Sequence, residues 1–172
     1  MKKKWLFLDI DGVLIHEEWY LSGIPSTMNT MESNFDPKCV ERVNRIINET
    51  GCELVVSSSW RLGVDLECIF KRVGLPDNFH RTPKLWKERG IEIDEFLKSV
   101  GEDEIGKNYA ILDDDTDFNI WQKKHNLFRT AASKLDEPYK RNEGTGLTDK
   151  LTDEIIKFLN NEKSKKRNTR NL

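Results

Sequence analysis

The sequence predicts an α/β fold in which a mainly parallel sheet is flanked by helices. Four short apolar runs have the length of buried strands, and segments with a helical repeat of apolar residues separate them. Strands that alternate with helices are typical of βαβ units, whose strands run parallel. A chain of 172 residues fits one domain with a well-buried core. The expected strands span residues 5–9, 52–56, 109–112 and 127–130.

The first strand is the unbroken apolar run WLFL, which ends in Asp9. Such a run is expected where a parallel strand is covered on both faces. Residues 15–35 are polar and contain a glycine and a proline, so we expect a loop or a short flap there. Asp36 followed by Pro37 then predicts the start of a helix that ends at Gly51.

The second half of the chain continues the alternation of strands and helices. Apolar residues at helical spacing predict helices over residues 63–73 and 91–100, and Gly74 is the expected stop of the first. The segment between them, residues 75–90, is expected to be rich in loops. Thr148 is predicted to cap a final helix.

Net charge does not discriminate between classes of partner, whereas the cysteines argue against two kinds of site. The 28 basic and 30 acidic residues nearly cancel, so net charge neither favours nor excludes a polyanionic partner. The three cysteines lack CxxC spacing and indicate neither a disulfide framework nor a zinc site. We expect buried or half-buried thiols in a reducing compartment.

The ends of the chain and its apolar runs bear on domain organisation and location. No apolar run approaches the ~20 residues of a membrane span, and acids interrupt the opening MKKKWLFL too early for a signal peptide. We therefore expect a cytoplasmic protein with no membrane partner. Residues 1–160 are the predicted domain, and residues 161–172 are a basic tail predicted to be disordered.

Polar side chains follow three of the predicted strands. The first strand is followed by Asp9 and Asp11, the second by the sequence SSSWR, and the third by the sequence DDD at residues 113–115. Ligands of open parallel sheets bind at the carboxyl ends of the strands, where these groups should meet. Clustered carboxylates suit Mg²⁺, and hydroxyl groups beside main-chain N–H groups suit a phosphate.

These segments resemble the motifs of the haloacid dehalogenase (HAD) superfamily of phosphotransferases. LDIDGVL matches the first motif, VVSSSWR the second, and AILDDDTD the fourth. SSSWR, RTP, ERGIEI, ILDDDTDF and GLT also resemble, in order, the small HAD domains associated with Swiss Army Knife RNA repair proteins. The resemblance implies a HAD-like Rossmannoid three-layer fold.

The resemblance also implies roles for the acids and hydroxyls at the strand ends. Asp9 would be the nucleophile that forms an aspartyl-phosphate. Asp11 would protonate the leaving oxygen and then act as the base that activates water. Because a halide leaves without a proton, this second acid favours a phosphatase over a dehalogenase. Ser57, or alternatively Ser58, would bind the phosphoryl group.

A magnesium site is implied at the same edge of the sheet. Asp113 and Asp114 would bind Mg²⁺ together with Asp9 and the main-chain carbonyl of Asp11. The metal would offset the repulsion between the anionic nucleophile and the anionic phosphate. Asp117 is a further candidate to orient the metal ligands, and which of these acids bind directly stays open.

The third motif, a basic residue before the fourth-motif strand, matches less closely. Lys84, Lys87 and Arg89 all fit by position, and Arg89 is favoured because it lies in the family-like ERGIEI. Arg61 is a further candidate ligand of phosphate or substrate. Trp60 beside it is expected in the core rather than stacked on a base.

The segments between the motifs are too short to hold a large cap domain, because expected helices and strands already occupy them. A site without a cap admits large phosphorylated substrates. Together with the RNA-repair resemblance, this favours a polynucleotide 3′-end phosphatase. A phosphatase of nucleotides or other small phosphate esters is the alternative. A non-catalytic phosphate-binding or interaction module is a third reading, against which the intact acids argue.

Overall fold

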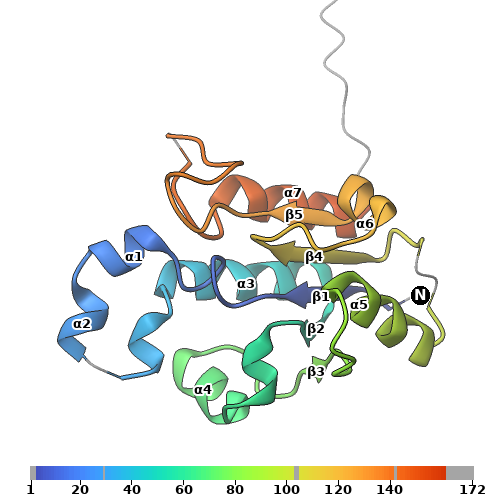
Figure 1. Cartoon of the computed structure of the whole chain (residues 1–172), viewed down its shortest axis with the longest axis horizontal. Coiled ribbons are helices and arrows are strands. Elements are labelled where there is room, and N and C mark those ends of the chain that lie inside the picture. Colours follow the sequence, from blue (N-terminus) through green and yellow to red (C-terminus); the bar gives the residue numbers. More distant parts are fainter. Residues whose placement is uncertain (1–2, 29, 103–104, 142, 162–172) are drawn as a thin grey trace, which may run out of the picture.

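The computed structural model describes residues 3–28, 30–102, 105–141 and 143–161, and these form the predicted α/β fold. Within them lies one sheet of five parallel strands in the order β3-β2-β1-β4-β5 (Figure 1). The strand that comes first in the sequence, β1, therefore occupies the centre of the sheet. The strands are β1 (Trp5–Leu8), β2 (Glu53–Val56), β3 (His80–Arg81), β4 (Tyr109–Asp113) and β5 (Leu127–Arg129).

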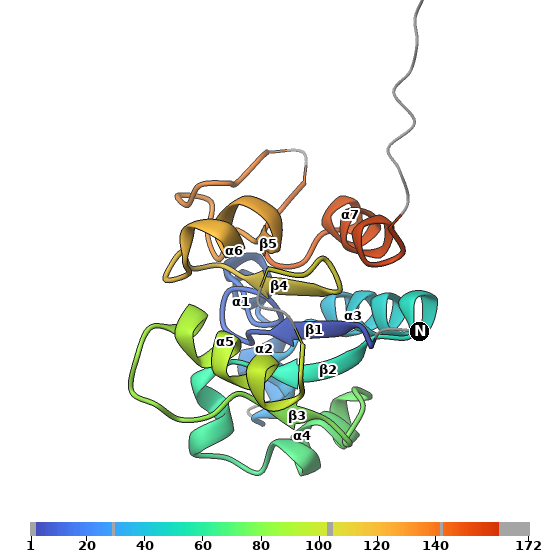
Figure 2. The same cartoon turned by 90° about the vertical axis from the view of Figure 1, so that its right-hand side faces the viewer.

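Helices cover both faces of this sheet. Figure 2 shows α3 and α7 on one face and α5 and α6 on the other, which is the expected three-layer arrangement. The α-helices are α1 (Glu17–Leu21), α2 (Ile24–Met28), α3 (Pro37–Thr50), α4 (Leu66–Val73), α5 (Arg89–Ser99), α6 (Ile120–His125) and α7 (Asp149–Leu159). Two 3-10 helices, η1 (Glu32–Asn34) and η2 (Ser59–Leu62), complete the described elements.

The central strand explains why the core has two halves. Side chains alternate along a strand, so successive residues of β1 point to opposite faces. Leu6 and Leu8 join a cluster that includes residues of α3, α4 and α7. Trp5 and Phe7 join a second cluster with α5, where both rings meet Phe96 edge to face at centroid distances of 5.3 and 5.5 Å. The apolar run WLFL is thus buried on both faces, as expected.

The helix signals of the sequence are confirmed where they are strongest. The Asp36 side chain accepts a hydrogen bond from the main-chain N–H of Lys38 at 2.9 Å and caps α3. Gly51 ends that helix in the left-handed conformation, at φ 66°. Thr148 caps α7 by accepting from the N–H of Leu151 at 3.3 Å.

The structure adds short elements that the pattern of apolar residues does not predict. The polar segment 15–35 contains α1, α2 and η1, and the loop-rich segment 75–90 contains β3. The helix α6 has six residues and is held by a capping box between Asn119 and Gln122. Elements this short contain too few residues to display a helical or strand repeat.

Three further expectations concern thiols, the tail and membranes. Cys39 and Cys52 are buried and Cys68 is half-buried, and all three thiols are free. Apart from Asn161, the predicted basic tail lies outside the described residues, and the domain boundaries 1–160 stay a prediction. In the described part of the chain, no helix combines the length and apolar composition needed to cross a bilayer.

Candidate active site

The register of the central strands brings the polar strand ends together. β1 pairs residue by residue with both β2 and β4, so the three strands end at one level. The pairing continues past the strands: Asp9 N donates to Leu112 O at 3.0 Å, and Ser57 N donates to Leu8 O at 3.0 Å. Asp9 therefore lies between Ser57 on one side and Asp113 on the other, at the predicted edge of the sheet.

Three carboxylates gather at this edge. One oxygen each of Asp9, Asp113 and Asp114 lie within 4.8 Å of one another. Burial raises the pKa of Asp9. Burial and the neighbouring charge of Asp9 raise the pKa of Asp113 to about 7 and that of Asp114 to about 6. Such a cluster favours a cation, because negative charges crowded in a buried site repel one another.

Arg89 is the basic residue that meets these carboxylates. Its Nη1 lies 3.0 Å from Asp9 Oδ2 and 2.5 Å from Asp113 Oδ2. Burial opposes the charge of Arg89, but the two carboxylates outweigh it and raise the pKa of the guanidinium. Of the three basic residues that fit the third motif by position, the structure brings Arg89 into the cluster.

Asp117 positions Arg89 at the start of α5. Its Oδ2 accepts from the main-chain N–H of Arg89 at 3.2 Å, and its Oδ1 lies 4.0 Å from Arg89 Nε. The main-chain carbonyl of Asp117 accepts from the N–H of Gly90 at 3.2 Å. Asp117 thus satisfies two N–H groups that a helix start leaves unpaired. These contacts connect the loop after β4 to the arginine.

Gly12 allows the turn after β1 to approach the cluster. Its φ of 72° lies in the left-handed region, and a Cβ atom there would lie 2.3 Å from Asp114 Cγ. A side chain at this position would therefore displace Asp114 as well as strain the turn. The sequence signal DxDG thus reflects a steric requirement of the site.

Asp11 lies on the exposed side of the site and is oriented by Trp60. The indole Nε1 donates to Asp11 Oδ2 at 2.9 Å. Trp60 also packs edge to face on Phe35, with ring centroids 5.7 Å apart. It is therefore partly in the core, as expected, but its hydrogen bond to Asp11 was not expected. The Asp11 carboxylate is not one of the three clustered carboxylates, which fits the implied use of its carbonyl.

The two serines after β2 are both buried at this edge. A hydrogen bond with Ser58 lowers the pKa of Asp9, in opposition to burial. Ser58 Oγ also accepts from Trp60 N at 3.4 Å and caps η2. Ser57 Oγ is buried and has no hydrogen-bond partner among the described residues. An unpaired buried hydroxyl is costly, so Ser57 is suited to a ligand oxygen.

Residues 5–138, most of the chain, match the family described as the HAD domain in Swiss Army Knife RNA repair proteins. The chain belongs to this family. The match confirms the resemblance seen in the motifs. Comparison with curated proteins and with solved structures gave no match.

Arg61 of this HAD domain was a candidate ligand of phosphate or substrate, but its guanidinium is buried and bonded within the protein. Its side chain is 5% exposed, and all five of its guanidinium N–H groups are engaged within the protein. No N–H group is left for a phosphate, so Arg61 instead positions the loop that carries the serines. Nη1 donates to Ser57 O and Ser58 O at 2.8 Å each, Nε to Thr82 O at 3.1 Å, and Nη2 to Pro83 O at 3.3 Å and to Glu92.

The lysines proposed for the third motif lie on the loop before α5 of the HAD domain. Lys84 Nζ is 4.0 Å from the ring centroid of Trp86, and both side chains are exposed. Lys87 is exposed as well. The described contact of Lys84 is therefore with an aromatic ring and not with the carboxylates.

A second buried polar group of the HAD domain is centred on His16, at the start of the segment 15–35. His16 Nε2 is 3.0 Å from Asp36 Oδ2, and His16 Nδ1 is 2.7 Å from Thr145 Oγ1. Burial opposes the charge of Asp36, but hydrogen bonds from His16 and Lys38 outweigh it and lower the pKa. This histidine has its partners within the fold, in line with a core role. Its partners come from distant segments, so spacing along the chain does not reveal them.

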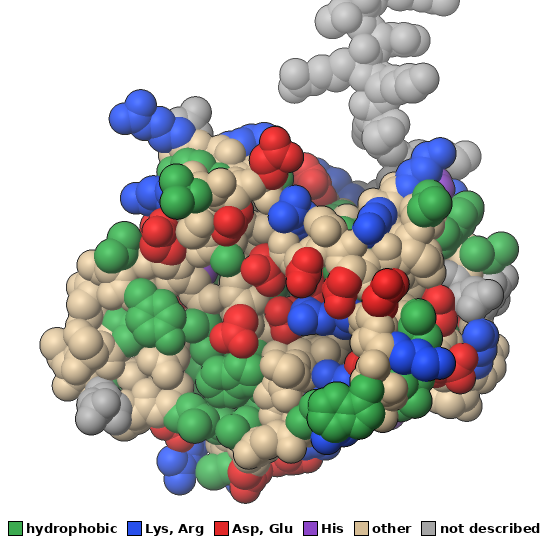
Figure 3. All heavy atoms as spheres, in the orientation of Figure 1, with side chains coloured by type: hydrophobic (Ala, Val, Ile, Leu, Met, Phe, Trp, Pro, Cys, Tyr) green, Lys and Arg blue, Asp and Glu red, His purple; other side chains and the backbone are tan. Residues whose placement is uncertain are grey.

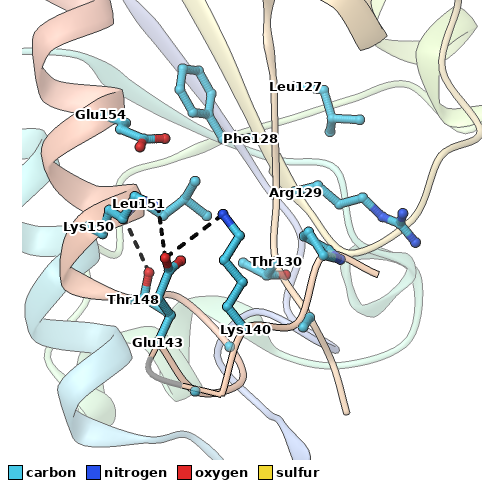
Figure 4. Close-up of a pocket in the computed structure, with 14 residues that line it drawn as sticks. Leu127, Phe128, Arg129, Thr130, Lys140, Glu143, Thr148, Lys150, Leu151 and Glu154 are labelled. Atoms are coloured by element: carbon cyan, nitrogen blue, oxygen red, sulfur yellow. Dashed lines mark hydrogen bonds and ion pairs between the residues drawn. The ribbon is translucent and has the colours of Figure 1, made fainter. Parts of the chain in front are cut away.

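A pocket of about 380 Å³ lies beside β5 and α7, and none of the three clustered carboxylates lines it. Figure 4 shows Lys140 pointing into this pocket toward Glu143, while Arg129 points away. Glu143 is within 2.8 Å of Lys150 Nζ and 3.9 Å of Lys140 Nζ. Glu143 is thus paired with lysines of the same pocket, and the residues predicted from the motifs gather at the carboxylate edge instead.

Proposed function

We propose that this HAD domain is a Mg²⁺-dependent phosphomonoesterase that works through an aspartyl-phosphate intermediate. The observation that carries the proposal is the cluster of Asp9, Asp113 and Asp114 with Arg89 at the ends of parallel strands. Membership of a HAD family found in RNA repair proteins supports the same activity. The proposal assigns catalysis to Asp9 and Asp11 and binding to the residues around them.

In the first step, a carboxylate oxygen of Asp9 attacks phosphorus and the bond from phosphorus to the leaving oxygen breaks. Asp11 donates its proton to that oxygen as it leaves. The Trp60 N–H holds the Asp11 carboxyl in place, at the exposed side where a leaving group would depart. In the second step, Asp11 takes a proton from water, which attacks phosphorus and releases phosphate and free Asp9.

Ser57 and Arg89 are the proposed ligands of the phosphoryl group. The Ser57 hydroxyl is buried and unpaired among the described residues, so a phosphate oxygen would satisfy it. The guanidinium of Arg89 already faces Asp9, where the negative charge of the transition state would develop. Ser58 instead serves Asp9 and η2 through its own hydrogen bonds.

The residues present fit a magnesium ion. Their carboxylate oxygens lie within 4.8 Å of one another, and burial together with the neighbouring charge of Asp9 raises the pKa values of Asp113 and Asp114. Asp9, Asp113, Asp114 and the carbonyl of Asp11 would hold the ion. When bound, Mg²⁺ would neutralise charge on the phosphate and the nucleophile.

The proposed substrate is the 3′-phosphorylated end of a polynucleotide. The family description names RNA repair, and the described segment between the first two motifs holds only the short α1, α2 and η1 before α3. These elements are too small to form a cap domain, and Asp11 is exposed at the site. A site of this kind can receive the end of a long chain.

The test is Mg²⁺-dependent phosphate release from three substrates: a 3′-phosphorylated RNA oligonucleotide, a nucleoside 3′-phosphate and an aryl phosphate. Replacing Asp9 by Asn removes the nucleophile and should lower release about a thousandfold or more. Asp77→Asn, at an exposed carboxylate outside the site, is the matched control and should keep full activity.

The outcomes separate the possible functions. Faster turnover of the oligonucleotide than of the nucleotide supports the polynucleotide substrate, and the reverse order would favour small phosphate esters. Absence of release from all three substrates with Mg²⁺ present would overturn the phosphatase and favour a non-catalytic binding module.

A further inference from the structure

Trp86 is an exposed aromatic residue in an unusual backbone conformation. Its side chain is 80% exposed, although tryptophan is a residue that folding normally covers at least in part. Its φ is 56°, in the left-handed region that bulky residues rarely adopt. Strained residues of this kind persist only where the surrounding structure holds them, and they concentrate at ligand sites.

The loop that carries Trp86 is anchored at its base. The main-chain N–H of Leu85 donates to Glu92 Oε1 at 2.8 Å, and the carbonyl of Pro83 accepts from Arg61 Nη2 at 3.3 Å. Arg61 and Glu92 are themselves a buried ion pair. The residues just before Trp86 are thus fixed to the protein interior, so the ring is presented outward from a supported loop.

This ring lies close to the carboxylate edge along the chain. Arg89, three residues after Trp86, is 3.0 Å from Asp9. Three residues of extended chain span at most ~11 Å between Cα atoms, and the Arg89 side chain spans the remaining distance to Asp9. Stacked nucleotides advance about 3.4 Å each along one strand, so the ring is within reach of the last few nucleotides of a strand that ends at Asp9.

Two exposed lysines flank Trp86 in the sequence. Lys84 Nζ lies 4.0 Å from the ring centroid, and Lys87 is exposed on the other side of Trp86 in the sequence. Figure 3 shows acidic side chains gathered near the centre of the face in view, with basic side chains among and beside them. An aromatic face flanked by lysines is the combination with which proteins bind single-stranded nucleic acids.

We propose that Trp86 is the stacking platform for a base near the 3′ end of single-stranded RNA, and that Lys84 and Lys87 bind the adjoining phosphates. The inference rests on the proposed function, since it takes the terminal phosphate to lie at Asp9. It adds a site for the bases, which the carboxylates and Arg89 do not provide. Stacking tolerates any base, so the site is expected to select single-stranded RNA without a preference for its sequence.

The first experiment compares kcat/KM for a 3′-phosphorylated RNA oligonucleotide with kcat/KM for an aryl phosphate. Trp86→Ala should lower the ratio of the two values about 5- to 100-fold, mainly through KM for the oligonucleotide. Trp86→Phe keeps an aromatic face and should restore much of the ratio. Leu135→Ala is the control, because Leu135 is 95% exposed and follows β5, at the opposite edge of the sheet from β3.

The second experiment measures binding without turnover. In the Asp9→Asn background, the Kd for the 3′-phosphorylated RNA should rise by a similar factor on Trp86→Ala. Lys84→Ala and Lys87→Ala should each weaken binding and reduce its dependence on salt. Equal Kd values with and without Trp86 would overturn the inference.

The two proposals fail in different ways. If wild-type protein hydrolyses the aryl phosphate but Trp86→Ala leaves the substrate ratio unchanged, the stacking platform is wrong and the phosphatase stands. If no substrate is hydrolysed, the proposed function is wrong, and the binding experiment still decides whether Trp86 contacts RNA.

Discussion

Arg61 and Arg89 are two arginines of the same region with opposite surroundings. Arg61 is paired with one carboxylate, Glu92, and its remaining N–H groups donate to main-chain carbonyls. Arg89 shares its Nη1 between two carboxylates, with Asp117 4.0 Å from its Nε. Among the described residues, no hydrogen bond engages Arg89 Nη2. A saturated arginine supports the structure, whereas an arginine with free N–H groups amid excess acid is available to a ligand.

Of the two arginines, Arg89 is expected to have the larger effect on turnover. Arg89→Met removes the donor that faces Asp9 and should lower kcat for the aryl phosphate about 100- to 1,000-fold. Arg89→Lys keeps the charge without the planar fork and should retain part of the activity. Steady-state kinetics with circular dichroism as a check of folding would measure both. If Arg89→Met kept the wild-type kcat, Arg89 would not be the arginine that acts on the substrate, and the contrast with Arg61 would be wrong.

The next effect concerns stability and the Arg61–Glu92 pair. Arg61→Met or Glu92→Met alone leaves a buried charge without its partner and should cost about 3–5 kcal/mol of unfolding free energy. The double variant should cost less than the sum, because no unpaired charge is left. Urea unfolding measures all three.

The control for this cycle is Arg45→Met, which breaks two exposed pairs, with Glu49 and with Asp153. Exposed pairs contribute little, so this loss should be much smaller than that of Arg61→Met. Equal losses at the two positions would contradict a structural role for the buried pair.

A further expected effect is a dependence of stability on pH and Mg²⁺ that arises around Arg89. The pKa values of Asp113 and Asp114 are about 7 and about 6 in the folded protein, against an ordinary value of 3.8. At pH values between the ordinary pKa and these raised pKa values, the folded state binds more protons than the unfolded state. The metal-free protein should therefore lose stability as pH rises from about 4 to about 7.

Magnesium should reverse this loss, since it binds the deprotonated carboxylates of the folded state. The rise in Tm on adding Mg²⁺ should be larger at pH 8 than at pH 5, as thermal unfolding at each pH would measure. Asp113→Asn should reduce the difference. An equal rise at both pH values would argue against a metal at this cluster.

Much of this site could be predicted because its signals are local. Asp9 and Asp113 each follow an apolar run, and parallel strands end at a common edge, so their meeting follows from the fold class. Arg89 was favoured because it lies in a family-like phrase. The family-like phrase therefore singled out the arginine that lies at the carboxylates, where charge alone left three candidates.

The missed contacts join segments whose separation in sequence carries no signal. Trp60 and Asp11 are 49 residues apart, and Arg61 and Glu92 are 31 apart. One clue was present: Glu92 lies on the same helical face as Phe96, which is buried. A carboxylate on a buried helix face requires a partner, and Arg61 is that partner.

The common register of β1 and β4 has a consequence for insertions and deletions. A shift of one residue in β4 would turn every side chain of that strand to the opposite face. The run Asp113, Asp114 and Asp115 would still present an acid at the strand end, but Ile111 and Leu112 would exchange layers of the core. An insertion or deletion in this strand would therefore disturb the packing of the core even if an acid still stood at the strand end. The free energy of unfolding is expected to fall before the catalytic groups are lost.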